Sequence, residues 1–261
     1  MRVPRIIHQT LPDKSNLPAE AARNIANLKS VNPGWRHILY DDRDIHEFIQ
    51  QSYGREMLAV FESINPLYGP ARADLFRYLL SYKIGGVYLD IKSGCQNPFD
   101  SFVQEEDALL LSRWRNRRGE IFAGWGVHPA DGVESEFQNW HIICAPEHPV
   151  MLAVIESVLW NLRHYSMQKY GVGKSGVLRT TGPIAYTKAI QPLLHQHACR
   201  IFDSEASGLV YSALPLPGKS GHKALFKKHY TRVKRPIVSG NRNRFRHHVQ
   251  YTILRWLRLI P

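Results

Sequence analysis

Cysteine is scarce in this chain, and its arrangement does not suit disulfides or structural zinc. Three cysteines occur among the 261 residues, at Cys95, Cys144 and Cys199. Their number is odd, they are far apart in the sequence, and no Cys-x-x-Cys pair is present. Disulfide frameworks and zinc sites use paired cysteines at characteristic spacings. We therefore predict three ordinary buried thiols.

Long apolar runs, internal repeats and low-complexity tracts are also missing from the sequence. No uninterrupted apolar run approaches the roughly 20 residues of a membrane-spanning helix. The amino terminus leads into a predicted strand without the apolar region of a signal peptide, so we expect a cytoplasmic protein. Because 44% of the residues are hydrophobic, the chain can bury one large core. We expect a single enzyme domain over residues 1–240.

Acidic residues are absent after Glu205. All 22 Asp and Glu lie at or before that position, together with 22 of the 34 Lys and Arg, so residues 1–205 are formally neutral. The whole net charge of +12 therefore lies in the carboxyl-terminal segment. Such segregation indicates an anionic partner near the carboxyl terminus.

Residues 241–261 have the pattern of a basic amphipathic helix. Arg255 and Arg258 occupy one face, and apolar side chains recur at helical spacing on another: Phe245, Val249, Ile253, Trp256, Leu257 and Ile260. Such a helix either lies in the interface of an anionic membrane or docks its apolar stripe on the catalytic domain. The first alternative predicts a peripheral protein on the inner face of the cytoplasmic membrane. The sequence leaves both alternatives open.

Hydrophobic periodicity predicts alternating strands and helices. We expect strands near residues 3–9, 35–40, 108–111 and 200–203, and helices near 18–30, from Asp41 or Asp42 onward, near 149–165 and from Pro183. This alternation is typical of an α/β fold with a mainly parallel central sheet.

The run from Pro70 to Asp90 is the most informative segment of the chain. Pro70 suits the first turn of a helix. Asp74 and Arg77, three residues apart, share one edge of that helix, whereas its inward-facing apolar stripe consists of Leu75, Tyr78, Leu79 and Tyr82. The pair either holds one ligand together or forms an ordinary intrahelical ion pair.

A glycine pair and a short strand follow this helix. Gly85 and Gly86 permit a tight turn and close backbone approach, and the apolar residues 87–89 read as a buried strand that delivers Asp90 to its carboxyl end. In open α/β sheets, ligands bind at that end. We therefore predict that Asp90 is a ligand-binding carboxylate.

This segment resembles the sugar-binding region of glycosyltransferase family 32, the DXD-type transferases that include bacterial capsule and lipopolysaccharide enzymes and fungal mannosyltransferases. The similarity is carried by Ala-Arg-Ala-Asp-Leu-Phe-Arg-Tyr followed by Gly-Gly-Val-Tyr-Leu-Asp, and it extends to residues 6–9, 32–42 and 139–149. The resemblance implies a single Rossmann-like domain of the GT-A type. It also implies retaining transfer of a sugar from a UDP- or GDP-sugar to a glycan or lipid-linked glycan.

The resemblance further implies which residues form the site. It places the donor against His8, Gln9, Asp74, Arg77, Gly86, Tyr88 and Asp90. It places Asp90 and Asn139 at the reaction centre, where we also expect Lys92, and it implies Asp90 and a late histidine as metal ligands; His229 is the candidate, with His222 as its competitor and a surface residue as the alternative. For His8 and Gln9, the alternative is a polar pair that ends a strand.

One position departs from the family pattern. Where Asp-x-Asp is usual, this chain has Asp90, Ile91 and Lys92, so a cation replaces one of two carboxylates expected to face a divalent metal. Asp90 alone can hold Mn²⁺ or Mg²⁺ with phosphate oxygens and water. Lys92 can instead neutralise part of the diphosphate charge, or it can be a solvated lysine after the strand. The need for a divalent metal is therefore open at this stage.

Three other motifs have less specific interpretations. Trp140 is either a core residue or a platform on which a sugar stacks. Residues 180–183, Thr-Thr-Gly-Pro, either line the acceptor side or cap the following helix, and we favour the cap. The glycine-rich residues 171–176 lack the first glycine of a phosphate loop and follow a predicted helix, so we exclude such a loop.

Two other function classes compete with an active transferase. A nucleic-acid-binding protein would explain the basic carboxyl segment but not the neutral body that carries Asp74, Arg77 and Asp90. We therefore expect no nucleic-acid partner. A catalytically inactive sugar-binding relative is compatible with Lys92, and turnover of a nucleotide sugar distinguishes it from an enzyme.

Overall fold

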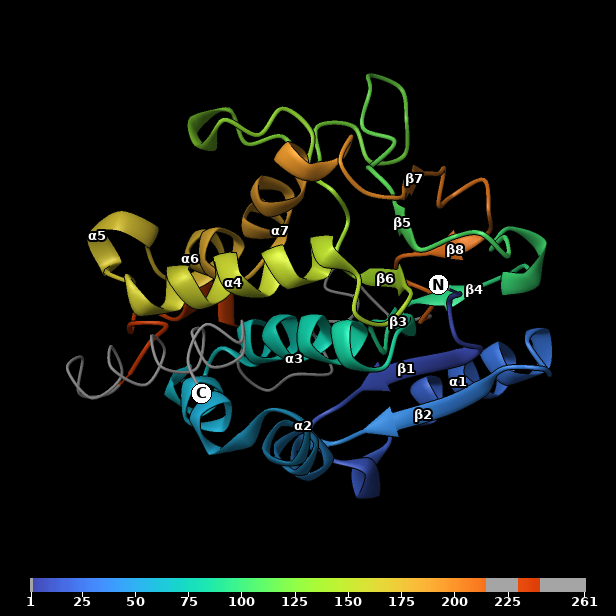
Figure 1. Cartoon of the computed structure of the whole chain (residues 1–261), viewed down its shortest axis with the longest axis horizontal. Helices are drawn as coiled ribbons and strands as arrows, with labels where there is room; N and C mark the ends of the chain where they lie inside the picture. Colours follow the sequence, from blue (N-terminus) through green and yellow to red (C-terminus); the bar gives the residue numbers. More distant parts are fainter. Residues whose placement is uncertain (1, 215–229, 240–261) are drawn as a thin grey trace.

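A computed structural model of the chain describes residues 2–214 and 230–239. Its centre is a six-stranded sheet with the strand order β2-β1-β3-β6-β5-β7 (Figure 1). These strands are β1 (Ile6–Thr10), β2 (Arg36–Tyr40), β3 (Gly86–Leu89), β5 (Leu109–Leu111), β6 (His141–Cys144) and β7 (Cys199–Ile201). A second sheet pairs β4 (Gly94–Cys95) with β8 (Leu209–Val210). The predicted basic helix and His229 lie outside the described residues.

The central sheet is mixed, with mainly parallel strands. β1 runs parallel to β2 and β3, and β5 runs parallel to β7, whereas β6 runs antiparallel to both of its neighbours, β3 and β5. The sequence pattern did not identify β6 as a strand. Because β6 is antiparallel to β3, the residues that precede β6 lie beside those that follow β3. This arrangement brings Asn139 and Trp140 to Asp90.

Helices cover both faces of the sheet. They are α1 (Ala19–Val31), α2 (Asp42–Ser63), α3 (Gly69–Lys83), α4 (Pro149–Arg163), α5 (Met167–Tyr170), α6 (Gly173–Thr180) and α7 (Pro183–Ile190). Helices α1, α3 and α4 and the starts of α2 and α7 lie close to the predicted positions, whereas α5 and α6 were not predicted. Short 3₁₀ turns are η1 (Lys14–Asn16), η2 (Phe99–Ser101), η3 (Pro129–Asp131), η4 (Gln191–Leu193) and η6 (Tyr230–Arg232). Asp41 begins α2 in a reciprocal capping box with Asp44, so the predicted cap is confirmed.

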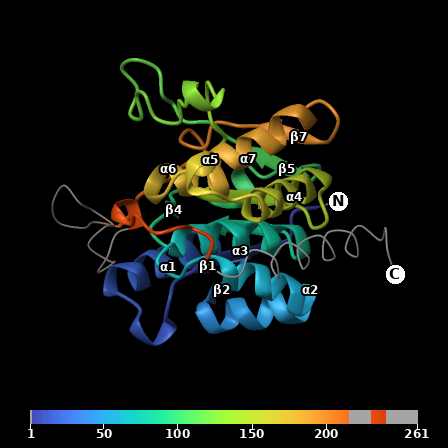
Figure 2. The same ribbon diagram turned by 90° about the vertical axis from the view of Figure 1, so that its left-hand side faces the viewer.

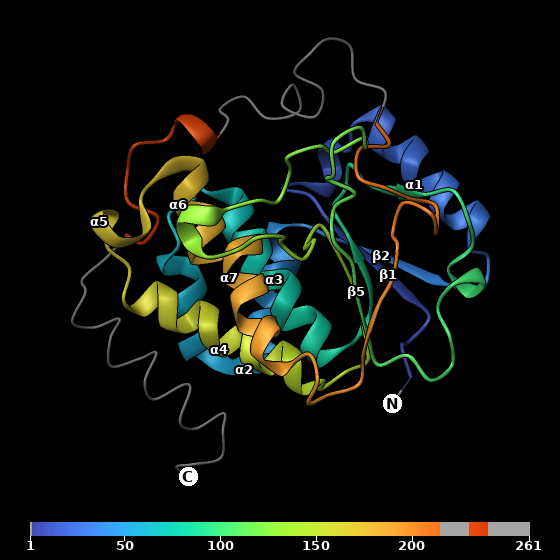
Figure 3. The same ribbon diagram turned by 90° about the horizontal axis from the view of Figure 1, so that it is seen from above.

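Alternate side chains of the strands divide the core into two layers. Tyr88 and Ile142 pack in the larger layer, beneath α2, α3, α4 and α7. Val87 and Ile143 point to the opposite face, where Leu28 of α1 joins them. Figures 2 and 3 show the helices on the two sides of the sheet.

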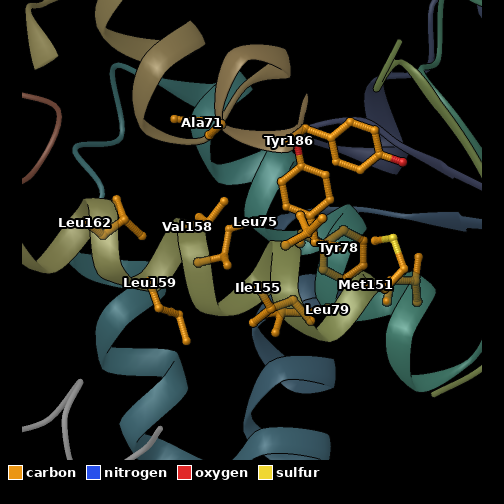
Figure 4. Close-up of a cluster of buried hydrophobic side chains, with 14 of the residues drawn as sticks. Ala71, Leu75, Tyr78, Leu79, Met151, Ile155, Val158, Leu159, Leu162 and Tyr186 are labelled. Carbon is orange, nitrogen blue, oxygen red and sulfur yellow. The ribbon is translucent and has the colours of Figure 1, made fainter. Parts of the chain in front are cut away.

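Helix α3 lies at the centre of the larger layer. Ala71 and all of residues 74–81 are buried, so the helix is enclosed rather than one-sided as the predicted stripe implied. The reason is that α2, α4 and the sheet all pack against it. Figure 4 shows its side chains meeting those of α4 and Tyr186, whose ring stacks on Tyr78 at a centroid distance of 5.5 Å. The Asp74 and Arg77 side chains are consequently inside the protein.

The segment 230–239 is tied to the start of α3 although the two are far apart in the sequence. The Tyr68 hydroxyl lies 2.6 Å from the Arg235 carbonyl oxygen, and the amide of Asn65 donates to the Pro236 carbonyl at 3.0 Å. Ile64 forms an isolated antiparallel bridge with Val238. The element η6 directly precedes these residues, so the contacts hold it against the rest of the domain.

The cysteines are free thiols, as predicted. Cys95 and Cys144 are buried, and Cys199 is half-buried. Within the described ranges, 2–214 and 230–239, no helix combines the length and apolar character that crossing a bilayer requires.

The Gly-Gly turn is required by internal packing. Gly85 and Gly86 have φ values of 71° and 97°, which favour glycine. A Cβ atom on Gly86 would lie 2.6 Å from the carbonyl oxygen of Ile6, and one on Gly85 would lie 2.7 Å from the nitrogen of Pro146. At Gly86 the close backbone approach that the glycine permits is an approach to β1, the strand that carries His8.

We expect Gly86→Ala to lower the free energy of unfolding by about 2 kcal/mol or more, because the alanine meets both a strained φ and a backbone oxygen. Urea unfolding followed by circular dichroism measures this change. Gly69→Ala is the control, since that exposed glycine begins α3 and has no atom within 4 Å of a built Cβ. Equal stability of the two variants would contradict the explanation.

Candidate active site

Asp90 lies where β3 ends, at the carboxyl edge of the sheet. Its backbone N–H donates to the Trp140 carbonyl at 2.9 Å, and its own carbonyl accepts from the Gln9 amide at 3.2 Å. The strands on either side of β3 thus fix its main chain. The Asp90 side chain remains 22% exposed, so its carboxylate is available to a ligand.

Arg77 links two carboxylates from inside the fold. Its Nη2 atom lies 3.1 Å from Oδ1 of Asp90 and 3.4 Å from Oδ1 of Asp74. The guanidinium also packs over the Tyr88 ring, at 4.7 Å from the centroid. Burial opposes the charge of Arg77, but Asp90, Tyr88 and Asp74 together keep its pKa above the ordinary value. The predicted gathering of Asp74, Arg77 and Asp90 is confirmed as geometry.

Asp74 is fully engaged with buried donors. Its Oδ2 accepts from the Thr181 hydroxyl at 2.9 Å, and its Oδ1 accepts from the Asn139 amide at 3.2 Å. Burial raises the pKa of Asp74 to about 6, against the opposing effects of Arg77 and the Thr181 hydrogen bond. The predicted cap of α7 by residues 180–183 is confirmed in part: Gly182 is the N-cap and Pro183 begins the helix, but no side chain caps it, and the Thr181 hydroxyl donates to Asp74 instead.

Asn139 stands behind the carboxylates. Besides Asp74, its amide donates to the Tyr78 hydroxyl at 2.8 Å, and that hydroxyl donates to the Thr181 carbonyl at 2.9 Å. The Asn139 carbonyl accepts from Nη1 of Arg77. Asn139 is buried, so the structure shows it supporting Asp74 and Arg77 from within, and its role at the reaction centre stays a prediction.

Lys92 follows Asp90 in a tight turn, and its side chain lies beside the Asp90 carboxylate. Its Nζ lies 3.8 Å from Oδ2 of Asp90 and 3.9 Å from the centroid of the Tyr211 ring. The Lys92 side chain is only 14% exposed. The alternative of a solvated lysine after the strand is therefore wrong.

His8, Gln9 and Tyr88 support the site from within. His8 is 1% exposed and Gln9 is 0% exposed. The His8 ring bonds the Tyr40 hydroxyl and the Gly85 carbonyl, and burial lowers its pKa to about 4. Gln9 bonds His37 and the main chain of Asp90, and the Tyr88 hydroxyl lies 3.5 Å from the Asp90 carboxylate. The structure thus favours the strand-ending alternative for His8 and Gln9 over donor contact.

Aromatic residues from distant segments form a wall beside Lys92. The Tyr211 ring lies 5.1 Å from Trp114, 5.6 Å from Trp140 and 5.8 Å from Trp125, measured between centroids. Trp140 is 4% exposed, which favours its interpretation as a core residue. Trp125 is 46% exposed. The sequence did not mark Tyr211, because it lies far from the motif and belongs to no pattern.

Tyr230 is influenced by the charges of the site. Burial raises the pKa of Tyr230, and the negative charges of Asp74 and Asp90 add to the shift. Its element, η6, is the one that the Tyr68 and Asn65 contacts attach to the start of α3. No pattern in the sequence marked Tyr230 as a site residue.

Comparison with known proteins finds similarity to glycosyltransferases in both sequence and fold. The family model described as a glycosyltransferase sugar-binding region containing a DXD motif matches residues 18–109. An inositol phosphoceramide mannosyltransferase of Schizosaccharomyces pombe is 32% identical over 42% of this chain and 34% of its own length. A second such enzyme from that yeast is 25% identical over 86% of this chain and 54% of its own length. A mannosyl phosphorylinositol ceramide synthase of Saccharomyces cerevisiae is 26% identical over 70% of this chain and 41% of its own length.

The chain thus spans about a third to a half of the length of these relatives. The solved structure of the PaToxG glycosyltransferase superposes with a TM-score of 0.53 at 14% identity, covering 97% of this chain and 87% of the other, and this likeness concerns the fold alone. The sequence matches support a glycosyltransferase family 32-like assignment, and the architecture is that of a GT-A domain.

We expect Asp74 to titrate near pH 6 rather than near its ordinary 3.8. Because its pKa is raised in the folded protein, Asp74 contributes stability that is full below about pH 4 and is lost as the pH rises through 6. The ¹³C shift of the Asp74 carboxyl, assigned with Asp74→Asn, measures this pKa. Thr181→Val removes a donor to the ionised form and should raise it further. A midpoint near pH 4 would contradict the buried position.

Proposed function

We propose that this chain transfers a sugar from a nucleoside-diphosphate donor to a hydroxyl group of a glycan or lipid-linked acceptor. The observation that carries the proposal is the placement of Asp90 at the carboxyl end of β3, oriented by the buried Arg77. That edge of an α/β sheet is where such ligands bind. The match of residues 18–109 to a sugar-binding region gives independent support.

In the proposed reaction, the acceptor oxygen forms a bond to the anomeric carbon of the donor. The bond between that carbon and the diphosphate oxygen breaks, and its electron pair leaves with the diphosphate. The departing diphosphate receives the proton of the acceptor hydroxyl. As in glycoside hydrolysis, the transition state has oxocarbenium character, and negative charge grows on the leaving group. Fixed cations near that group therefore lower the barrier.

The residues divide into a contacting group and a positioning group. We propose that Asp90 contacts the sugar or ribose hydroxyls of the donor, since its carboxylate is the partly exposed one. Arg77 and Asp74 are each about 5% exposed, so they act by holding Asp90 in place. Attack from the face that the diphosphate leaves would retain the anomeric configuration. This retention is part of the proposal.

We propose that the acceptor is a glycan or a polyhydroxylated lipid headgroup. The relatives named above carry names that refer to inositol phosphoceramide, which is a lipid with such a headgroup. The narrower expectation of a capsule or lipopolysaccharide acceptor stays a prediction. The competing hypothesis of an inactive sugar-binding relative differs in one observable, because it binds the donor without releasing nucleoside diphosphate.

The test is release of nucleoside diphosphate from a panel of UDP- and GDP-sugars, with a disaccharide or inositol phosphoceramide acceptor. We expect one donor to be consumed, and Asp90→Asn to lower the rate about 100-fold. Asp100→Asn is the matched control, since Asp100 pairs with Arg5 ahead of β1, at the other end of the sheet. Donor binding without release would favour the inactive relative, and no donor binding would overturn the proposal.

We also propose that the protein is cytoplasmic and associates peripherally with the inner face of the membrane through its basic carboxyl segment. The basis is the sequence pattern of residues 241–261, where each Lys or Arg near an anionic surface contributes about 1 kcal/mol. Sedimentation with phosphatidylglycerol vesicles, but not with phosphatidylcholine vesicles, is the expected result. A protein ending at residue 240 should stay in the supernatant. Equal sedimentation of both proteins would contradict the membrane role.

A further inference from the structure

The carboxylates at the site are already matched by cations. Oδ1 of Asp90 faces Arg77 at 3.1 Å, and Oδ2 faces Lys92 at 3.8 Å. Both oxygens of Asp74 accept hydrogen bonds from buried donors, Thr181 and Asn139. Two carboxylates and two basic side chains therefore compensate each other without any added ion.

This donor set does not fit a divalent cation. Magnesium and manganese ions prefer carboxylate oxygens together with phosphate and water. At this site an incoming ion would compete with Arg77 and Lys92 for the carboxylate of Asp90, and both would repel it. Within residues 2–214 and 230–239, no cluster of three or more His, Cys, Asp or Glu side chains could hold a metal ion. The family description refers to a DXD motif, but Lys92 stands at its last position.

Lys92 is held in place by the surrounding backbone. Its carbonyl accepts from the Ala213 N–H at 2.8 Å, and the amide of Asn24 donates to the carbonyls of Ile91 and Ser93 at 3.2 and 2.9 Å. The Tyr211 ring underlies the ammonium group, a favourable cation–π contact. The turn after β3 therefore presents a cation at a fixed position rather than on a freely moving stem.

We propose that Lys92 replaces the divalent metal, so that this site binds and activates the donor diphosphate without a metal ion. An ammonium group has three N–H donors and binds phosphate as a point charge. Next to Asp90, it lies where negative charge develops when the bond to the anomeric carbon breaks. Lys92 thus contacts the leaving group, whereas Arg77 orients Asp90. The inference rests on the proposed transferase function and specifies its electrostatics.

Binding of UDP and GDP by isothermal titration calorimetry, in Mn²⁺ and in EDTA, tests this proposal. We expect the wild-type Kd of the preferred nucleotide to change less than twofold between the two conditions. Lys92→Met, which keeps the length of the stem, should weaken binding at least tenfold in EDTA and lower kcat. Lys92→Asp, which restores the Asp-x-Asp pattern, should bind the nucleotide better in Mn²⁺ than in EDTA by at least tenfold.

Lys83→Met is the matched control, because Lys83 is exposed at the end of α3 that leads into the amino end of β3. It should bind like wild type, and thermal unfolding should show that all variants are folded. Tenfold weaker wild-type binding in EDTA, or unchanged binding by Lys92→Met, would overturn the proposal while leaving the transferase intact. Failure to bind any nucleotide or nucleotide sugar under either condition would overturn both.

Discussion

The burial of one guanidinium, that of Arg77, is the constraint on which the rest of the site depends. A buried cation is tolerated only when partners compensate it, and Arg77 has Asp90, Asp74, the Asn139 carbonyl and the Tyr88 ring. Removing one member of such a buried pair typically costs about 3–5 kcal/mol, because the other charge is left unpaired. These partners come from α3, from β3 and its end, and from the approach to β6, so these three elements have to be positioned together. The need to compensate the buried charge of Arg77 therefore constrains how α3, β3 and the approach to β6 pack together.

The antiparallel strand β6 is what satisfies this requirement. A parallel strand beside β3 would start at the opposite edge of the sheet, and its preceding residues would lie far from Asp90. Because β6 runs the other way, Asn139 and Trp140 arrive at the carboxyl end of β3, where their carbonyls accept from Arg77 and from the Asp90 N–H. The exposed carboxylate of Asp90 is thereby held by a rigid second layer. Supporting shells of this kind are what keep a site in a productive geometry.

The parts of this arrangement that could be predicted from the sequence are local ones. Helical spacing brought Asp74 and Arg77 together, and the Gly-Gly turn and buried strand placed Asp90, because each of these patterns spans a few residues. Strand β6 was missed because its short apolar run has no distinguishing period. Thr181 was misjudged because a threonine before a helix usually serves as a cap. Tyr211, Tyr230 and the enclosed position of Lys92 depend on contacts between distant segments, which no local pattern encodes.

The attachment of the 230–239 segment has a consequence for the order in which the protein is made. Asn65 and Pro236 are 171 positions apart, and Tyr68 contacts Arg235 across 167 positions. Contacts of such high sequence separation slow folding, because a long loop has to close before they form. The ribosome releases the amino-terminal part first, so the sheet edge with Asp90 emerges well before the 230–239 segment. During synthesis, the nascent chain therefore passes through a stage in which Arg77 and its partners have been made but Asn65 and Tyr68 still lack their contacts with this segment.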